Sequence, residues 1–367
     1  GARASAARRG ARASAAAPPR AQAKTLDLWL LQKERDESNM LDSDLAIVLT
    51  SVASACKRIS NLVAKAPLAG NTGLADGVTN TSGDEVKKLD LIANEVFCAA
   101  VEDSGRSGIV VTEEEDVPVA VEHSSGGYIV TFDPIDGSSN IDACVTTGSI
   151  FGIYSPGDCE VSMDDTPEQI LENCTTNVRQ SGEELVCAGY CMYSSSTILM
   201  LTVGDGVYGF TLDTTLGDFV LTHDNVRIPD GKDAQRIFSG NLGNMQWWDE
   251  SLVGYVDTLT DPEKAGGKPY SYRYIGALVG DFHRTLLYGG IWLYPPDSKA
   301  PEGKARLLYE VAPMGFIAEQ AGGLATFGDK AEKRVLDVVP YAVHQKHPMF
   351  VGSKSEVERL QTYLQAL

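Results

Sequence analysis

Two carboxylates stand in the turn that directly follows the apolar run Tyr128–Phe132. The turn reads Asp-Pro-Ile-Asp-Gly-Ser-Ser-Asn at residues 133–140. Pro134 fixes its own φ and stiffens the turn, so that Asp133 and Asp136 can converge on one point. The glycine and small residues that follow let backbone N–H groups approach an anion. The turn therefore predicts a metal ion on one side and a phosphate on the other.

A second acidic cluster follows the neighbouring apolar run Ile109–Thr112. Four carboxylates stand at 113–116, while Asp84 lies at a polar helix start and Asp90 about one and a half turns later. Crowded carboxylates are unfavourable without cations, and hard oxygen ligands suit Mg²⁺ or Mn²⁺, which bridge to substrate phosphates. Taken alone, the run at 113–116 is typical of a solvated surface loop. Beside the turn at 133–140, a metal site is the better interpretation.

Cationic and hydroxyl side chains gather instead in the C-terminal half. They are Arg273, Tyr274, Arg284, Tyr294, Lys304 and Arg306. Such groups could hold a second, distal phosphate, which would explain why an acidic protein keeps a basic pocket. Their spacing equally fits solvated cations and core tyrosines, so it leaves the two interpretations balanced.

Both helices and strands must position these groups. Apolar residues at helical spacing predict two helices between Thr25 and Ala66, ended by Pro67 and Gly70, then a loop at 70–83 and a helix at 84–101. Strands are expected at 109–112, 128–132 and 149–154, with a hairpin of 197–203 and 207–212. Strands then alternate with helices near 246–260, 272–288, 306–322 and 354–367. The pattern predicts a mixed α/β fold with sheets sandwiched between helices.

Composition bounds the class of protein. The chain has 367 residues, 43% hydrophobic and 22% charged, which is enough for two packed domains. Its formal net charge of −19 argues against nonspecific binding to nucleic acid. We find no run of about 18 apolar residues and therefore expect no membrane span. Residues 1–24 contain Arg and Ala but no Asp or Glu, which favours an organelle transit peptide over a disordered basic tail.

Five motifs occur along the chain in a fixed order. They are Gly-Asp-Glu-Val-Lys-Lys-Leu-Asp at 83–90, Thr-Glu-Glu at 112–114, the turn at 133–140, Arg-Tyr-Ile-Gly at 273–276 and Leu-Leu-Tyr-Glu at 307–310. Together they resemble the fructose-1,6-bisphosphatase family, in particular its chloroplast form, from about residue 41 to 364. The turn alone would indicate only the wider lithium-sensitive phosphatase group. The resemblance implies an α/β layered α-β-α-β-α sandwich, a homotetramer, and two lobes at 25–220 and 221–367.

The resemblance also implies roles for individual residues in the hydrolysis of fructose 1,6-bisphosphate at its 1-phosphate. Two or three Mg²⁺ ions, or Mn²⁺, would be bound by Glu113, Glu114, Asp133, Asp136, Glu310 and the carbonyl of Ile135. Asp84 with Glu114 would deprotonate the attacking water, and Asp90 beside Glu113 would support proton transfer near the leaving group. The 1-phosphate would be held by Gly137, Ser138 and Ser139. The distal 6-phosphate and the sugar would be held by Asn241, Arg273, Tyr274, Tyr294 and Lys304, with Arg273 reaching across a subunit interface.

The acidic segment 155–184 resembles the regulatory insertion of the chloroplast form, a target of thioredoxin, with the f type as the expected partner. Cys159 and Cys174 match two of the insertion's three cysteines, and the third position is Arg179. We expect Cys159 and Cys174 to form an exposed, labile loop disulfide, against the alternative of two unpaired thiols. The implied setting is the Calvin-Benson cycle in the chloroplast stroma. The nearest rival substrate is sedoheptulose 1,7-bisphosphate.

Overall fold

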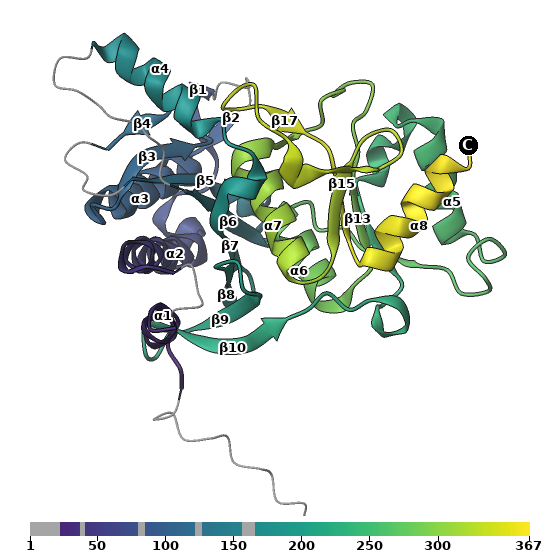
Figure 1. The fold of residues 1–367 in the computed structure, drawn as a ribbon, viewed down its shortest axis with the longest axis horizontal. Coiled ribbons are helices and arrows are strands. Elements are labelled where there is room, and N and C mark those ends of the chain that lie inside the picture. Colours follow the sequence, from purple (N-terminus) through teal and green to yellow (C-terminus); the bar gives the residue numbers. More distant parts are fainter. Residues whose placement is uncertain (1–22, 37–40, 80–84, 122–126, 156–165) are drawn as a thin grey trace, which may run out of the picture.

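The computed structural model describes residues 23–36, 41–79, 85–121, 127–155 and 166–367. Its helices and sheets form five layers, with an eight-stranded and a six-stranded sheet separated by helices (Figure 1). Three hydrophobic clusters fill the spaces between the layers. The expected mixed α/β layered sandwich is confirmed.

The first layer consists of α1 (Leu26–Glu34), α2 (Ser43–Ala69) and α3 (Lys88–Asp103), packed on one face of the larger sheet. Asp42 caps α2 by accepting a hydrogen bond from the backbone N–H of Leu45 at 2.7 Å. Gly70 ends α2 in the left-handed conformation, with φ of 70°. Pro67 lies inside the last turn of α2, so the expectation that it ends the helix is wrong, whereas the expected end at Gly70 is confirmed.

The larger sheet has the strand order β10-β9-β8-β7-β6-β5-β3-β4. Its strands are β3 (Ser107–Thr112), β4 (Val119–Ala120), β5 (Tyr128–Asp136), β6 (Thr147–Tyr154), β7 (Leu185–Tyr193), β8 (Thr197–Thr202), β9 (Val207–Asp213) and β10 (Asp218–Val226). β3 and β5 are parallel, whereas all other neighbours in this sheet are antiparallel. Parallel neighbours end at the same edge, and this edge brings the acidic cluster at 113–116 beside the turn at 133–140.

The remaining layers belong to the C-terminal part. A central layer holds α6 (Leu278–Tyr288) and α7 (Ala312–Gln320). A single π-helical turn, Leu307–Val311, directly precedes α7. The six-stranded sheet has the order β12-β11-β13-β18-β15-β16. Its strands are β11 (Ile237–Ser239), β12 (Ser271–Tyr272), β13 (Ile291–Tyr294), β15 (Leu324–Phe327), β16 (Lys333–Arg334) and β18 (Met349–Gly352). The last layer contains α5 (Glu250–Thr260) and α8 (Lys354–Gln365), and β14 (Ala305–Arg306) pairs with β17 (Lys346–His347).

Two features differ from expectation. The segment expected to be a loop at 70–83 contains β1 (Leu74–Thr79), which pairs antiparallel with β2 (Glu85–Lys87).

By length and composition α2 could cross a membrane, since its best 18-residue window has a mean hydropathy of 1.2, with 39% of that window buried. In the fold, α2 packs against α3 and the larger sheet, and residues such as Val48, Val52 and Ile59 lie fully inside the first core.

The described part of the predicted regulatory segment is helical rather than an open loop. Thr166 caps α4 (Pro167–Val178) by accepting the N–H of Gln169 at 3.3 Å, and α4 packs against β3 and β4. Cys174 lies on α4 and is 1% exposed, so the expectation of an exposed position is wrong for this cysteine. Cys159 lies outside the described residues, as does the predicted transit segment up to residue 22.

Candidate active site

Three carboxylates converge where β5 ends. Asp133 and Asp136 lie in the last residues of β5, and Glu310 lies in the π-helical turn before α7. One oxygen from each carboxylate can be chosen so that all three lie within 4.8 Å of one another. Asp133 is 2% exposed and Asp136 7% exposed. Glu310, 174 residues beyond Asp136, thus completes one compact set of oxygen donors with the two aspartates.

Backbone N–H groups fix the two aspartates. The N–H of Ile135 donates to Asp133 Oδ1 at 2.9 Å, which folds the turn back on its first carboxylate. Both oxygens of Asp136 accept hydrogen bonds from the start of α6, from Leu278 N at 3.1 Å and Val279 N at 2.7 Å. A helix N-terminus favours a negative charge, so this contact stabilises Asp136 as an anion.

The acidic residues after β3 and on α3 extend the set. Asp90 lies in the first turn of α3, where the N–H of Lys87 donates to its Oδ2 at 2.9 Å. Its Oδ1 is buried without a hydrogen-bond partner among the described residues. Glu113 and Glu114 directly follow β3, and Glu113 Oε1 lies 3.9 Å from Arg306 Nε. We call Asp90, Glu113, Glu114, Asp133, Asp136 and Glu310 the carboxylate cradle.

Burial raises the pKa values of the carboxylate cradle. Desolvation, reinforced by Glu113, raises the pKa of Asp133 and of Glu310 well above their usual range. Desolvation also raises the pKa of Asp90 and of Asp136 to about 7. At Asp136 it outweighs the N–H groups of Leu278 and Val279, which lower the pKa. The pKa of Glu114 rises to about 8, through desolvation and then the charges of Asp90 and Glu113. Repelling, poorly solvated carboxylates with an unsatisfied oxygen on Asp90 are the donor set that a hard divalent cation suits.

The predicted phosphate turn lies next to the cradle. Gly137 has a φ of 74°, and a Cβ at this position would lie 2.6 Å from Cβ of Ala277, so glycine is required here for two reasons. Ser138 and Ser139 begin a short 3-10 helix, Ser138–Ala143. The Asn140 side chain ties this helix to the next loop by donating to the carbonyl of Thr146 at 3.0 Å.

The residues predicted to bind the distal phosphate are less tightly organised. We call Asn241, Arg273, Tyr274, Tyr294 and Lys304 the distal group. Burial raises the pKa of the Tyr274 and Tyr294 hydroxyls, and nearby carboxylates raise it further, with Asp281 the largest such cause for Tyr274 and Glu310 for Tyr294. Lys304 Nζ is paired with Asp297 Oδ2 at 3.0 Å, and the exposed Arg273 donates to the carbonyl of Tyr272 at 2.8 Å. Asn241 Oδ1 accepts the N–H of Gly243 at 3.1 Å.

One organising residue was missed by the sequence analysis. Asp281 on α6 is 1% exposed, and its carboxylate accepts from Ile275 N at 3.0 Å, Gly276 N at 3.1 Å and Arg284 Nη2 at 2.8 Å. These contacts shape the segment that carries Arg273 and Tyr274. Its position on the apolar face of an amphipathic helix was a usable signal, because a carboxylate there must find partners. Asp84, by contrast, lies outside the described residues.

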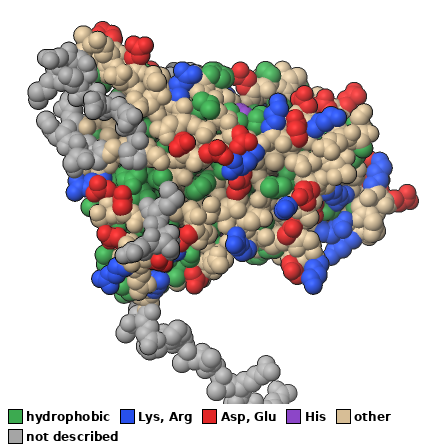
Figure 2. All heavy atoms as spheres, viewed as in Figure 1, with side chains coloured by type: hydrophobic (Ala, Val, Ile, Leu, Met, Phe, Trp, Pro, Cys, Tyr) green, Lys and Arg blue, Asp and Glu red, His purple; other side chains and the backbone are tan. Residues whose placement is uncertain are grey.

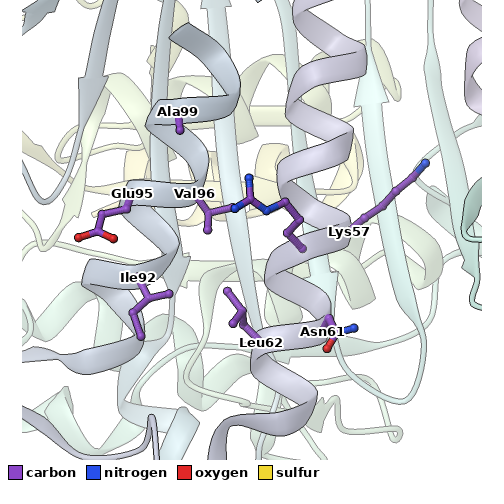
Figure 3. A pocket seen from close by; sticks show the side chains of 8 residues that line it. Lys57, Asn61, Leu62, Ile92, Glu95, Val96 and Ala99 are labelled. Atoms are coloured by element: carbon purple, nitrogen blue, oxygen red, sulfur yellow. The ribbon is translucent and has the colours of Figure 1, made fainter. Parts of the chain in front are cut away.

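Hollows elsewhere on the surface do not coincide with the cradle. One of about 770 Å³ lies between α2 and α3 and is lined by residues such as Asn61, Leu62 and Glu95 (Figure 3), none of which belongs to the predicted site. Another of about 810 Å³ is lined by several cations: Lys232, Arg236, Lys268, Arg273 and Arg284. On the face drawn in Figure 2, basic side chains gather around the end of the molecule that carries α5 and α8.

The five layers and the cluster of buried carboxylates at the ends of two parallel strands define a layered α/β protein with a centre suited to divalent cations. Comparison with known proteins gives the family. Residues 24–224 match the model "Fructose-1-6-bisphosphatase, N-terminal domain", and residues 232–365 match that of the C-terminal domain. The chain therefore belongs to the fructose-1,6-bisphosphatase family, whose members are phosphoric monoester hydrolases, and so is itself an enzyme of that class.

Individual relatives agree with this assignment. The chloroplastic fructose-1,6-bisphosphatase of Triticum aestivum is 54% identical over 360 residues, which cover 96% of this chain and 86% of the relative. That of Brassica napus is 55% identical over 345 residues, covering 93% of this chain and 82% of the relative. The holo-form crystal structure of Leishmania major fructose-1,6-bisphosphatase superposes with a TM-score of 0.84 at 38% identity, covering 94% of this chain and 99% of that one.

Proposed function

We propose that this enzyme hydrolyses the 1-phosphate of fructose 1,6-bisphosphate to fructose 6-phosphate and phosphate, with Mg²⁺, in the Calvin-Benson cycle of the chloroplast stroma. The observation that carries the proposal is the convergence of Asp133, Asp136 and Glu310 within 4.8 Å, all poorly solvated. The chloroplastic names of the plant relatives support the compartment, and the acid-free residues 1–24 fit a transit peptide.

The carboxylate cradle would hold two or three cations, with the Ile135 carbonyl as a further ligand. Bound Mg²⁺ would neutralise phosphate charge and lower the pKa of the attacking water. Glu114 and Asp84 would accept the proton of that water, a role suited to Glu114 because its pKa lies at about 8. Asp90, with a pKa of about 7 and next to Glu113, would handle the proton near the departing sugar oxygen.

The substrate phosphates would be held at two ends. Backbone and hydroxyl groups of Gly137, Ser138 and Ser139 would bind the 1-phosphate, because the left-handed Gly137 ends β5 and Ser138 and Ser139 begin the 3-10 helix that follows. The distal group would bind the 6-phosphate and the sugar. Arg273 is exposed at a hollow rich in cations, which supports the proposal that it reaches into the site of a neighbouring subunit in a homotetramer.

Regulation by thioredoxin through a Cys159–Cys174 disulfide completes the proposal. Because Cys174 is 1% exposed on α4, an incoming thiolate would attack the sulfur of Cys159 or wait for α4 to open. α4 packs against β3, the strand that leads into Glu113 and Glu114, so strain in the regulatory segment would displace two cradle residues. The division into lobes at residue 220 stays a prediction.

The substrate is tested by initial rates of phosphate release from the two bisphosphates under reducing conditions with Mg²⁺. We expect a clear preference for fructose 1,6-bisphosphate. A preference for the seven-carbon sedoheptulose 1,7-bisphosphate would overturn the substrate assignment, while release from neither would overturn the activity.

The regulatory pairing is tested with Cys174→Ser, which we expect to be fully active without reductant. Cys144→Ser is the matched control, since Cys144 lies outside the regulatory segment, and it should keep the wild-type requirement for reduced thioredoxin. A Cys174→Ser enzyme that still needs reduced thioredoxin would show that this pairing is wrong.

A further inference from the structure

Two backbone carbonyls in the segments that carry the cradle cannot be satisfied by regular backbone hydrogen bonding. The first belongs to Leu308, two residues before Glu310 in the π-helical turn. In this turn the N–H of Ala312 donates to the carbonyl of Leu307, five residues earlier. The next donor in the same pattern would be residue 313, which is Pro313 and has no N–H.

Two buried hydroxyls take over the carbonyl of Leu308. Thr131 Oγ1 on β5 donates at 3.1 Å, and Tyr154 OH at the end of β6 donates at 3.2 Å. Thr131 is 0% exposed and Tyr154 is 1% exposed. Thr131 Oγ1 also lies 3.3 Å from the carbonyl of Gly152, a longer contact than the one to Leu308. The larger sheet is thereby fastened to the turn that presents Glu310.

The second carbonyl is that of Pro134, between the two aspartates. The pairing of β5 with β6 shifts register between Asp133 and Asp136, so the backbone ladder is interrupted there. Ser149 Oγ on β6 donates to Pro134 O at 2.6 Å. Ser149 has a single hydroxyl hydrogen, so in the contact of 2.8 Å between Ser149 Oγ and Tyr193 OH, the tyrosine is the donor.

We propose that Thr131, Ser149, Tyr154 and Tyr193 are positioning residues for the metal centre: their hydroxyls hold the Asp133–Asp136 turn and the Glu310 turn in the relative geometry that binds divalent cations. The proposal rests on the proposed function of the cradle. The cradle carboxylates repel one another, so an external scaffold is needed to keep them together before a cation binds. Buried hydroxyls that served only the packing of the core could donate to any carbonyl. Here both sets of hydroxyl hydrogen bonds reach carbonyls of segments that carry cradle residues, those of Leu308 and Pro134.

A matched control lies on the same sheet. Tyr190 on β7 is 0% exposed like the positioning residues, but its hydroxyl is 2.8 Å from Nδ1 of His283, which is not a cradle residue. Tyr190→Phe therefore loses a buried hydroxyl contact of the same kind without touching the segments that carry Asp133, Asp136 or Glu310. Its loss of stability measures the structural part of the effect.

The test is Mn²⁺ binding, followed by electron paramagnetic resonance, to the full chain carrying Tyr154→Phe, Thr131→Val or Tyr193→Phe. We expect each variant to bind Mn²⁺ about 10-fold more weakly than wild type, and Tyr190→Phe within about 2-fold of it. Thr131→Ser keeps the hydroxyl and should restore most of the affinity that Thr131→Val loses. In steady-state assays the Mg²⁺ concentration for half-maximal rate should rise in parallel, with the KM for substrate unchanged.

Three results would overturn the inference. If the phenylalanine and valine variants melt at lower temperature but bind Mn²⁺ as wild type does, the hydroxyls have a structural role alone. If Tyr190→Phe weakens binding equally, the effect is not specific to the cradle segments. If Thr131→Val fails to fold, Mn²⁺ binding by Tyr154→Phe decides between the positioning role and a structural role alone. If wild type itself binds no Mn²⁺, the proposed metal function fails, and the positioning role falls with it.

Discussion

The carboxylate cradle and the distal group are built in opposite ways. In the cradle, Asp90, Asp133 and Asp136 are buried, and their carboxylates accept hydrogen bonds from backbone N–H groups, as when Leu278 and Val279 donate to Asp136. The distal group is more exposed, with 42% of Tyr274 accessible, and its charges are engaged elsewhere within the chain. Lys304 pairs with Asp297, and Arg273 folds onto the carbonyl of Tyr272.

This contrast separates a group of carboxylates fixed within the fold from a group of more exposed side chains. Buried carboxylates are costly, and the fold accepts them because the N–H groups and the enclosing layers fix them in advance. Exposed cations change the free energy of folding little, and they gain a strong interaction only when an anion binds. The carboxylate cradle is therefore pre-organised within the chain, whereas under the proposed function the distal group would take its final form only with the substrate and a neighbouring subunit.

The largest effect should come from removing one charge from the cradle. Asp133→Asn keeps the size of the side chain and an acceptor for the N–H of Ile135, but removes a charged ligand. We expect turnover to fall about 10³-fold, equivalent to about 4 kcal/mol of transition-state stabilisation. The metal-free protein should become more stable, because like charges repel in this buried group. Initial rates at saturating Mg²⁺ and urea unfolding in EDTA measure the two effects.

Asp224→Asn provides the control, since Asp224 is an exposed carboxylate on β10, and it should change neither quantity. Opposite changes in activity and stability are the signature of a site maintained for function. If Asp133→Asn lowered both, the carboxylate would be a structural partner rather than a ligand, and the contrast between the two regions would lose its basis.

How far the sequence predicted the site depends on the range of the contacts involved. The turn at 133–140 and the acidic run at 113–116 were predictable, because each directly follows an apolar strand and local chemistry determines its shape. Glu310 joined the list through resemblance, since 174 residues separate it from Asp136. The capping of Asp136 by α6 and the pairing of Lys304 with Asp297 had no local signal, because both depend on how separate segments pack.

The fold shows the same limit. Periodicity indicated helices in most of the places where the structure has them, but not α4; the predicted β8–β9 hairpin is confirmed by the antiparallel pairing of its strands. The β1–β2 pair was not predicted, because a Gly/Asn/Thr-rich sequence has turn character and its strands are recognised only through their pairing.

A medium effect should come from the distal group. If Arg273 binds the 6-phosphate as proposed, Arg273→Ala would remove a charge-assisted hydrogen bond to it, and we expect the KM for fructose 1,6-bisphosphate to rise about 10- to 100-fold. The Mg²⁺ concentration for half-maximal rate should stay unchanged, because Arg273 is not part of the cradle. Arg227→Ala, at an arginine that donates to the carbonyl of Gln320, is the control and should leave KM as in wild type.

Co-expression sharpens this prediction. A mixed oligomer of Arg273→Ala and Asp133→Asn chains contains sites with a wild-type cradle from one subunit and Arg273 from another. If Arg273 acts across the interface, activity with the wild-type KM should reappear in the mixture. Activity that keeps the raised KM of Arg273→Ala would mean that each chain supplies its own Arg273, and that the distal end is as complete within one chain as the cradle.

The smallest effect should be a pH dependence of stability that belongs to the cradle. The pKa values of about 7 for Asp90 and Asp136 and about 8 for Glu114 exceed the values near 4 of an unfolded chain. Between these limits the folded protein holds more protons than the unfolded one. The stability that these protonated carboxyl groups contribute is therefore fully present below about pH 4. It is lost as pH rises from there through the folded pKa values of about 7 to 8, by up to about 1.4 kcal/mol per pH unit for each proton.

Urea unfolding at pH 6, 7 and 8 in EDTA and in saturating Mg²⁺ measures this slope. In EDTA, stability should fall as pH rises. In Mg²⁺ the slope should flatten or reverse, because deprotonated carboxylates bind the cation and binding stabilises the folded state. Equal slopes with and without Mg²⁺ would mean that the raised pKa values and the cation site belong to different groups.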